Sequence, residues 1–351
     1  MEFSNLRLLG FLAGVSLAVM AFVYFRRNQI STGAFLTTAV AGFCMMAVGV
    51  NPNIVNMFLG MLNLEAREYS RIIALLIITN IVAIFSILQL YKKIAYYNYV
   101  ASNTILAIAT AWFYERRRSF ACKDVAVVIP AFNEADNIEP VLKEIPVAVN
   151  GLNVVTLVID DCSSDSTGSV AEGKGAFVAK MPIQLGGGIA TQAGFSILRE
   201  TDVQYVVTMD ADGQHLPSEM PVLLKPLMNG EADVVIGSRL LGSYEDYSSI
   251  RILGVRFFGQ FISFITGKKV TDPASGYRAL TADAMNKLDL RQRQYHTSEL
   301  IIEAIKKGFR IVEVPITIRR RHSGTSKKGG VVVYAMGFAK VVLQTWLRTP
   351  K

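Results

Sequence analysis

The sequence has few charged residues for its length. Only 18% of its 351 residues are charged, whereas soluble domains carry about 25%. Half of the residues (51%) are hydrophobic, and the mean hydropathy is +0.35. These values argue against a disordered chain and against a purely soluble protein. The length allows for about two domains.

Cysteine and two nucleotide-binding signatures are also scarce or missing. The three cysteines, Cys44, Cys122 and Cys162, have no regular spacing. This argues against a disulfide framework and a zinc site and favours a reducing compartment. The sequence has no P-loop, and no GxGxxG follows its first expected strand. It therefore lacks the signatures of P-loop nucleotidases and of dinucleotide-binding enzymes.

The charges that are present are unevenly distributed. Residues 1–118 hold 10 Lys and Arg against 4 Asp and Glu, whereas residues 119–351 hold 26 against 24. The first third combines this low charge with long apolar runs, and the remainder has the charge density of a soluble domain. The chain therefore divides near residue 118 into a membrane part and a globular part. The weak basicity of the globular part does not suggest a nucleic-acid partner.

Three runs in the first part contain no charge. They are Leu8–Phe25, Ile30–Val50 and Ile72–Tyr91, with 18, 21 and 20 residues. A helix needs about 20 apolar residues to cross a bilayer. We therefore predict an integral, multi-pass transmembrane domain over residues 1–94, with spans at 8–25, 30–50 and 72–91. The alternative for the first run is a cleaved signal peptide, which two further runs in succession disfavour.

Basic residues near the ends of these runs predict the orientation. Arg26 and Arg27 follow the first run, Lys92 and Lys93 follow the third, and Arg116–Arg118 precede the globular part. Such clusters favour the cytoplasmic side, so three spans place the globular part in the cytoplasm. Residues 96–114 are long enough for a fourth span. Their tyrosines and polar residues instead favour an interfacial helix and linker over 95–118.

The globular part, residues 119–328, alternates short apolar runs with amphipathic segments. Val125–Ile129, Val154–Ile159 and Tyr205–Met209 are β-branched and apolar and predict buried strands, with a fourth at 234–236. Helical patterns lie between them at 137–145 and 188–200. This alternation predicts a Rossmann-like α/β fold with a mostly parallel sheet.

Polar residues follow each expected strand, where ligands bind in open α/β sheets. The clearest example is Asp210-Ala211-Asp212, with Gln214 at the next alternate position. Magnesium usually takes one or two carboxylates together with substrate phosphates, so this segment predicts a metal and phosphate site. Helix capping is the alternative for individual Asp and Asn residues. For Gly186–Gly188, phosphate contact and close backbone packing both stay open.

Six motifs occur in a fixed order. They read VVIPAFNEADN from Val127, VIDDCSSDST from Val158, MDADGQH from Met209, GSR from Gly237, DPASGYR from Asp272, and VPI from Val314 with Arg321, Gly324, Ser326 and Lys327 after it. Over about residues 124–328 the chain resembles family 2 glycosyltransferases with the GT-A fold, most closely the dolichyl- and polyprenyl-phosphate sugar synthases. Its first 118 residues resemble a small three-span membrane module.

The resemblance implies roles for the matching positions. The nucleotide-sugar would contact Pro130, Phe132, Glu134, Ile159, Asp161, Asp210, Ala211, Asp212, Arg239, Arg321 and Lys327. Mg²⁺ or Mn²⁺ would bind Asp210, Asp212 and Gln214, and the catalytic set would be Asp212, Arg239 and Asp272. Arg251 and Arg256 would bind the acceptor phosphate. Cys162, Gly187 and Gln192 depart from the usual residues, which leaves the donor open.

The implied activity is inverting, metal-dependent transfer of one sugar. The donor would be a nucleoside diphosphate sugar of the GDP-mannose or UDP-glucose type, and the acceptor would be dolichyl or polyprenyl phosphate at the cytoplasmic membrane face. One alternative is transfer to a glycolipid or polysaccharide hydroxyl, for which Glu299 is the next candidate base. The late Gln-x-x-Arg-Trp motif of processive polysaccharide synthases is absent. A catalytically dead membrane scaffold is the other alternative.

The C-terminal residues carry a separate signal. From Arg319 onward there are eight basic residues and no acidic one, and apolar residues recur at helical spacing after Gly329. We predict an amphipathic helix over 329–351 that lies on an anionic membrane surface, with packing on the core as the alternative. The sequence leaves a homo-oligomer open.

Overall fold

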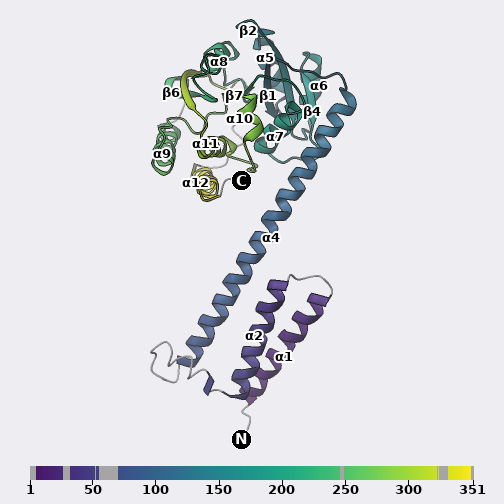
Figure 1. Ribbon diagram of the computed structural model, residues 1–351, viewed down its shortest axis with the longest axis vertical. Helices are drawn as coiled ribbons and strands as arrows, with labels where there is room; N and C mark the ends of the chain where they lie inside the picture. Colours follow the sequence, from purple (N-terminus) through teal and green to yellow (C-terminus); the bar gives the residue numbers. More distant parts are fainter. Residues whose placement is uncertain are drawn as a thin grey trace. The chain divides into compact units, whose positions relative to one another are not determined.

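The computed structural model describes residues 5–26, 32–51, 53–54, 70–245, 249–321, 323 and 331–348. Internal contacts divide the chain into two units, Met1–Tyr99 and Val100–Lys351. Figure 1 labels the helices and strands of both units. The predicted nucleotide contact Lys327 lies outside the described residues.

In the first unit, α1 (Asn5–Arg26) and α2 (Thr32–Val50) pack closely because glycines face the partner helix. A Cβ atom on Gly14 would lie 2.6 Å from the carbonyl oxygen of Gly42. Phe25 and Phe35 stack with their ring centroids 4.6 Å apart. Small residues that let backbones approach are typical of helix pairs in membranes.

Three described helices are long and apolar enough to cross a membrane. Two of them, Arg7–Arg26 and Gly33–Val50, coincide with the first two predicted spans. The third predicted span, 72–91, lies in α4 (Ser70–Arg116), where the side chains of residues 70–78 and 81 are outside the described set. The remaining candidate, Ser249–Thr266, is α9 of the globular unit and was not predicted as a span.

Helix α4 crosses the predicted boundary at residue 94 without a break. Its 47 residues contain neither glycine nor proline, so nothing in the sequence interrupts its hydrogen bonds. The separate helix predicted over 95–118 is thus the C-terminal part of α4. Leu106, Ala109 and Phe113 recur on one face of that part and are buried in the core of the globular unit. This packing places the division between the units at Tyr99, inside the helix.

The globular unit is built on a mixed sheet. Its strands run in the order β2-β3-β1-β5-β7-β6-β8, and β4 pairs with β3. They comprise β1 (Val125–Ala131), β2 (Ala148–Val149), β3 (Leu152–Asp160), β4 (Phe177–Lys180), β5 (Tyr205–Thr208), β6 (Val234–Tyr244), β7 (Arg278–Thr281) and β8 (Ile311–Ile318). Strands β4, β3, β1 and β5 are parallel, as are β6 and β8. The predicted mostly parallel sheet is confirmed, whereas the antiparallel β7 in its middle was not foreseen.

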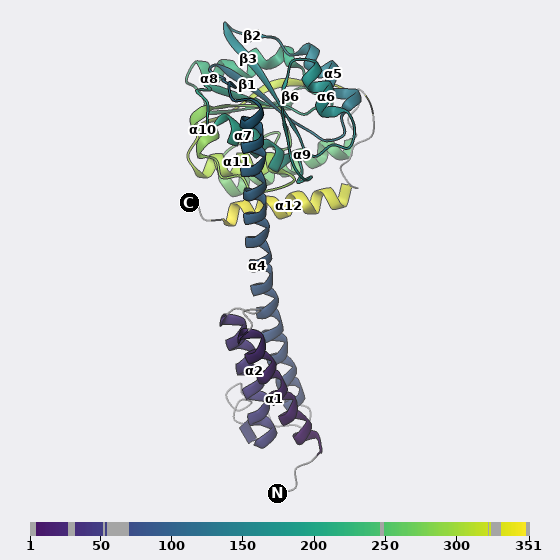
Figure 2. The same cartoon turned by 90° about the vertical axis from the view of Figure 1, so that its right-hand side faces the viewer.

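Helices cover both faces of this sheet, as Figures 1 and 2 show. They comprise α5 (Ala135–Glu144), α6 (Thr167–Gly173), α7 (Gly187–Leu198), the short η1 (Pro217–Glu219), α8 (Met220–Met228), α10 (Ala282–Lys287) and α11 (His296–Lys306). Alternate residues of β1 point to opposite faces. Val127 and Ile129 therefore join the core under α5, α6 and α8, and Ala126 and Val128 join the core under α7 and α4.

A third core joins three helices at one end of the unit. Helix α9 (Ser249–Thr266) and α12 (Val331–Leu347) pack with α11 around Phe258, Ile302 and Phe338. The two helices leave apolar side chains exposed on their other sides. These are Ile250, Leu253, Phe257 and Phe264 on α9, and Met336, Leu343, Trp346 and Leu347 on α12. The predicted C-terminal helix is therefore present and also packs on the core.

Replacing Phe113 with alanine tests whether the end of α4 belongs to the globular fold. Phe113 is 3% exposed and meets Phe120 edge-on at 5.0 Å. Phe113→Ala should destabilise the globular unit by about 3–5 kcal/mol, because it leaves a cavity in a packed core. Thermal unfolding in detergent measures this. The matched control is Trp112→Ala, a neighbour that is 49% exposed. An equal effect of both substitutions would contradict the assignment.

Candidate active site

The ends of three parallel strands bring the polar motifs together. Strand β1 lies between β3 and β5, with Val127 opposite Thr156 on one side and Val207 on the other. The carboxyl ends of the three strands therefore meet at one edge of the sheet. The residues that follow them, Asn133-Glu134, Asp161 and Asp210–Asp212, lie along that edge as the sequence predicted.

The Asp210–Asp212 turn is held by its own neighbours. The backbone N–H of Asp210 donates to Nδ1 of His215 at 3.1 Å, and Asp212 Oδ1 accepts from the backbone N–H of Gln214 at 3.1 Å. His215 is 4% exposed and stacks on Tyr277 at 5.0 Å. Because Nδ1 accepts a hydrogen bond, this histidine is neutral and carries its proton on Nε2. The sequence analysis gave His215 no role, since the contact is visible only in the folded turn.

Arg321 joins the first motif to this turn. Its Nη2 forms an ion pair with Glu134 Oε1, and its Nη1 lies 3.9 Å from Asp212 Oδ2. Burial alone would lower the pKa of Arg321, but the hydrogen bond to Glu134 and the charges of Asp212 and Asp210 raise it. Arg321 therefore stays charged. The structure thus brings together three predicted residues that are up to 187 positions apart in the chain.

Asn137 fixes the segment that carries Arg321. Its Oδ1 accepts from the backbone N–H of Ser323 at 2.9 Å, and its Nδ2 donates to Glu134 Oε2 at 2.6 Å. Asn137 is 4% exposed. It lies in the first motif, but nothing in the sequence shows that it binds the chain beyond β8.

Ile159 and Ala211, two of the predicted nucleotide contacts, are almost completely buried. Ile159 is fully buried, and its backbone lies within β3 between Pro130 of β1 and Ala179 of β4. Ala211 is 4% exposed and belongs to the core beneath the turn. Both residues support the shape of the site from below. Pro130 and Phe132 are half-buried at its edge.

Asp161 holds the glycine stretch that precedes α7. Its two carboxylate oxygens accept from the backbone N–H groups of Leu185 and Gly186, at 2.8 and 2.7 Å. Asp161 is 2% exposed, and burial raises its pKa despite these two bonds. Gly186 has φ of 93°, and a Cβ on Gly188 would lie 2.0 Å from the carbonyl oxygen of Gln292. The glycines therefore allow close backbone packing, which was one of the two open alternatives.

Asp272 and Arg239 form a buried ion pair. Arg239 donates to Asp272 Oδ2 from Nε at 2.6 Å and from its backbone N–H at 3.1 Å. Asp272 is fully buried and Arg239 is 5% exposed. Within the described residues, Asp272 Oδ1 has no hydrogen-bond partner. The geometry fits a carboxylate that orients Arg239 better than one that meets an acceptor.

A second buried arginine stabilises this region. Arg278 is 1% exposed and donates to the carbonyl oxygens of Ser275 and Pro273 at 2.8 and 3.1 Å. Burial lowers its pKa to about 9, against the opposing charges of Asp272, Asp210 and Glu313. It therefore remains a cation at neutral pH. The sequence analysis did not assign it a role.

Glu299, the candidate base for a hydroxyl acceptor, is fully buried. Its carboxylate accepts from the backbone N–H groups of Arg291 and Gln292, both at 2.9 Å, and from Arg348 Nη1 at 3.0 Å. Burial raises its pKa. A carboxylate enclosed in this way cannot reach an acceptor, so its geometry does not fit the role of base.

The two predicted acceptor arginines, Arg251 and Arg256, are both exposed on α9. Five positions apart on an α-helix, they point about 140° away from each other. The assignment of both residues to the acceptor phosphate stays a prediction.

The side-chain oxygens of the turn suit a hard divalent cation as ligands. Asp210 and Asp212 stand two residues apart in one turn, and the charges of both raise the pKa of Arg321. The side-chain amide nitrogen of Gln214 donates to the carbonyl oxygen of Arg319 at 3.2 Å, which leaves its amide oxygen as the group to face a cation. Among the described residues, no cluster of three or more His, Cys, Asp or Glu could hold a metal. Two carboxylates suit magnesium when substrate phosphates complete its coordination.

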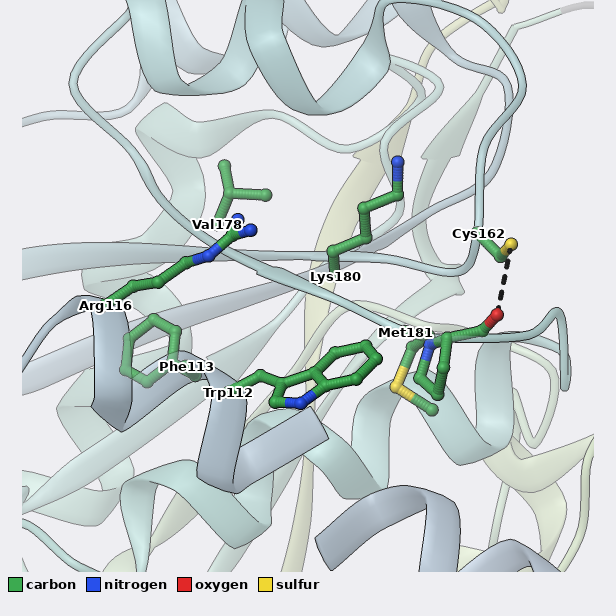
Figure 3. A pocket seen from close by; sticks show the side chains of 8 residues that line it. Trp112, Phe113, Arg116, Cys162, Val178, Lys180 and Met181 are labelled. Atoms are coloured by element: carbon green, nitrogen blue, oxygen red, sulfur yellow. Dashed lines mark hydrogen bonds between the residues drawn. The ribbon is translucent and has the colours of Figure 1, made fainter. Parts of the chain in front are cut away.

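A hollow of about 280 Å³ lies beside the turn after β3. Figure 3 shows Trp112, Phe113 and Arg116 of α4 opposite Cys162, Lys180 and Met181. Cys162 has φ of 62° and donates from its thiol to the carbonyl oxygen of Pro182 at 3.7 Å. The turn thus accepts a cysteine where related enzymes usually have glycine. Through this hollow the end of α4 meets the segment that follows Asp161.

Replacing His215 with phenylalanine tests its role in the turn. Phenylalanine keeps a ring to stack on Tyr277 but removes the acceptor for the Asp210 N–H. His215→Phe should lower the free energy of unfolding by about 1–3 kcal/mol, the range for an unsatisfied buried donor. Denaturant unfolding measures this, with Tyr277→Phe as the comparison that keeps the stack and loses only the hydrogen bond from its hydroxyl to the Leu216 carbonyl oxygen. An unchanged midpoint for His215→Phe would show that the bond is unimportant.

Known proteins match this chain in sequence and in fold. The pattern of glycosyl transferase family 2 matches residues 126–289. The undecaprenyl-phosphate mannosyltransferase of Micrococcus luteus is 34% identical over 63% of this chain and 93% of its own length. The polyprenol monophosphomannose synthase of Mycolicibacterium smegmatis is 32% identical over 58% of this chain and 80% of its own length.

Solved structures agree on the fold. Glucosyl-3-phosphoglycerate synthase from Mycobacterium tuberculosis, solved with Mn²⁺ and UDP-glucose, matches with a TM-score of 0.53 and 22% identity, over 67% of this chain and 82% of that one. This similarity confirms the GT-A-like arrangement of a mixed sheet between helices. The sequence matches show that the chain belongs to glycosyl transferase family 2 and is a hexosyltransferase.

Proposed function

We propose that the protein transfers one hexose from a nucleoside diphosphate sugar to a polyprenyl phosphate, with inversion, at the cytoplasmic face of a membrane. The observation that carries this is the cluster of Glu134, Arg321 and Asp212 at the strand ends, where a diphosphate would meet both a cation and metal-binding carboxylates. The names of the Micrococcus luteus and Mycolicibacterium smegmatis relatives support a lipid phosphate as acceptor.

The step forms one bond and breaks one. An oxygen of the lipid phosphate attacks the anomeric carbon of the sugar, and the bond from that carbon to the diphosphate breaks on the opposite side. The nucleoside diphosphate leaves with the electron pair. Arg321 and Arg239 stabilise the charge that develops on it, because arginine offers a planar fork to phosphate oxygens. A bound Mg²⁺ or Mn²⁺ would supply further positive charge at the diphosphate through Asp210, Asp212 and Gln214.

The buried carboxylates favour a phosphate acceptor over a hydroxyl. A hydroxyl must lose its proton to a base within hydrogen-bond reach. Asp272 and Glu299, the two carboxylates considered for this task, are fully buried and bound to arginines. A phosphate is already an anion at neutral pH and needs no such base. Retention of the charged cluster also disfavours a catalytically dead scaffold.

The apolar surface of α9 and α12 supports acceptor binding at a membrane. Ile250, Leu253 and Phe257 are exposed on one face of α9, and the same helix carries the exposed cations Arg251 and Arg256. Apolar residues next to cations suit an interface of acyl chains and phosphate groups. We propose that this surface and the first unit together keep the site at the leaflet that holds the polyprenyl chain. The multi-pass topology with a cytoplasmic globular unit is part of this proposal.

Removing Asp212 tests the metal and donor assignment. Asp212→Ala should reduce turnover at least about a hundredfold, the scale for loss of a key electrostatic stabiliser. Asp283→Ala is a matched control, because Asp283 forms an exposed ion pair with Lys287 on α10. Product is measured as radiolabelled lipid extracted after incubation with a panel of nucleotide sugars and Mg²⁺ or Mn²⁺. Full activity in excess chelator would contradict the metal requirement.

Removing Arg251 tests the phosphate acceptor. Arg251→Ala should raise the apparent KM for polyprenyl phosphate about tenfold or more, since a charge-assisted bond is worth about 1.5–3 kcal/mol. The KM for the donor should stay nearly constant. Lys287→Ala removes an exposed cation elsewhere and serves as the control. An Arg251→Ala enzyme with an unchanged acceptor KM would remove this residue from the acceptor site.

A further inference from the structure

The loop Asp289–Tyr295 lies directly against the glycine stretch. The backbone N–H of Gly188 donates to the carbonyl oxygen of Arg293 at 3.0 Å. A Cβ on Gly186 would lie 2.7 Å from that same oxygen, and one on Gly188 would lie 2.0 Å from the carbonyl oxygen of Gln292. The two backbones touch without side chains between them. A shift of the loop must therefore move the glycines.

Glu299 fixes the other side of this loop. Its carboxylate accepts from the backbone N–H groups of Arg291 and Gln292, both at 2.9 Å. These two residues immediately precede Arg293. Because Glu299 is fully buried and sits in the first turn of α11, it ties the loop to a helix in the core of the unit.

Arg348, the residue after α12, completes the connection. Its guanidinium donates to Glu299 Oε1 at 3.0 Å, to Glu303 Oε2 at 2.8 Å and to the carbonyl oxygen of Asp289 at 2.8 Å. Arg348 is 16% exposed. Lys306 of α11 adds a second tie, since its Nζ donates to the carbonyl oxygens of Thr345 and Trp346 at 2.9 and 3.1 Å. The C-terminal end of α12 is therefore held against the base of the loop.

We propose that Arg348 and Glu299 are positioning residues of the donor site. They hold the loop Asp289–Tyr295, which holds Gly186–Gly188 against the carboxylate of Asp161. Affinity for the nucleotide-sugar then depends on α12 being docked, although neither residue reaches the donor. The inference rests on the proposed function, because it takes Asp161, which the family resemblance assigns to the nucleotide, as a contact of that donor.

The same contacts explain how the carboxyl group of Glu299 can be fully buried. A buried carboxylate without partners is unfavourable. Here the hydrogen bonds from two backbone N–H groups and from the guanidinium of Arg348 offset that cost. A purely structural tie between α11 and α12 would need only the Arg348–Glu303 pair. Glu299 also accepts from the backbone N–H groups of Arg291 and Gln292. These additional bonds fix the loop and, through the loop, the position of the glycines.

The test compares variants of the full-length protein in detergent. Arg348→Ala should raise the donor KM and weaken binding of UDP or GDP with Mg²⁺ by about tenfold, the effect of losing a charge-assisted bond. Arg348→Lys should show a smaller shift, because a lysine keeps the charge but lacks the two separate nitrogens with which Arg348 meets Glu299 and Glu303. The acceptor KM should not change. Calorimetric titration and steady-state kinetics give these values.

Two further variants keep the result interpretable. Arg310→Ala removes an ion pair with Asp233, at 2.7 Å, that does not touch the loop, and it should leave nucleotide affinity unchanged. If Arg348→Ala fails to fold by circular dichroism, Glu299→Gln provides the same test. It retains one carbonyl oxygen for a backbone N–H and loses the charge, so it should raise the donor KM by a smaller factor.

The outcomes separate this inference from the proposed function. A wild-type protein that binds the nucleotide, together with folded Arg348 and Glu299 variants that bind it equally well, would overturn the inference alone. A fall in kcat with an unchanged donor KM would also overturn it. A wild-type protein that binds neither UDP nor GDP with Mg²⁺ would overturn the proposed function and the inference with it.

Discussion

Mutual repulsion among carboxylates at the ends of parallel strands is the constraint around which the site is arranged. The fold brings Glu134, Asp161 and Asp212 to one edge of the sheet, where like charges raise one another's free energy. Two devices offset this repulsion. Arg321 pairs with Glu134 and lies near Asp212, and two backbone N–H groups serve Asp161. A donor diphosphate with its metal would add negative and positive charge together, and so could enter without disturbing this balance.

The sequence revealed those parts of the fold and the site that depend on local patterns. Apolar runs placed the strands, and the DxD segment and the late arginine located the edge where they meet. The sequence did not reveal contacts between segments that lie far apart in the chain. The antiparallel β7 and the bond from Asp210 to His215 depend on tertiary pairing. Burial was equally hidden, so the sequence did not show that Glu299 and Ile159 are fully enclosed. The absence of glycine and proline over 70–116 was visible and would have indicated one helix.

The continuity of α4 matters because one helix has residues in both units. Its first part contains the third predicted span, and its last turns contribute Leu106 and Phe113 to the core beneath the sheet. Trp112 and Arg116 of the same turns line the hollow beside Cys162. The globular fold is therefore completed by the helix that leaves the first unit, so the glycosyltransferase unit begins before the predicted linker ends.

The choice of acceptor decides which residues such a site requires. An enzyme that activates a hydroxyl must keep a carboxylate or imidazole accessible and near its own pKa, at the place where the acceptor enters. Here the buried Asp272 and Glu299 are hydrogen-bonded to arginines and backbone N–H groups. These bonds hold both carboxylates in place and leave them unsuited to proton transfer with an acceptor. A phosphate acceptor needs no accessible base, since it is already an anion. The polyprenyl chain of the proposed acceptor would confine it to the membrane, where the apolar side of α9 could meet it. Rigid, buried acids and an apolar outer surface are thus both compatible with the proposed acceptor.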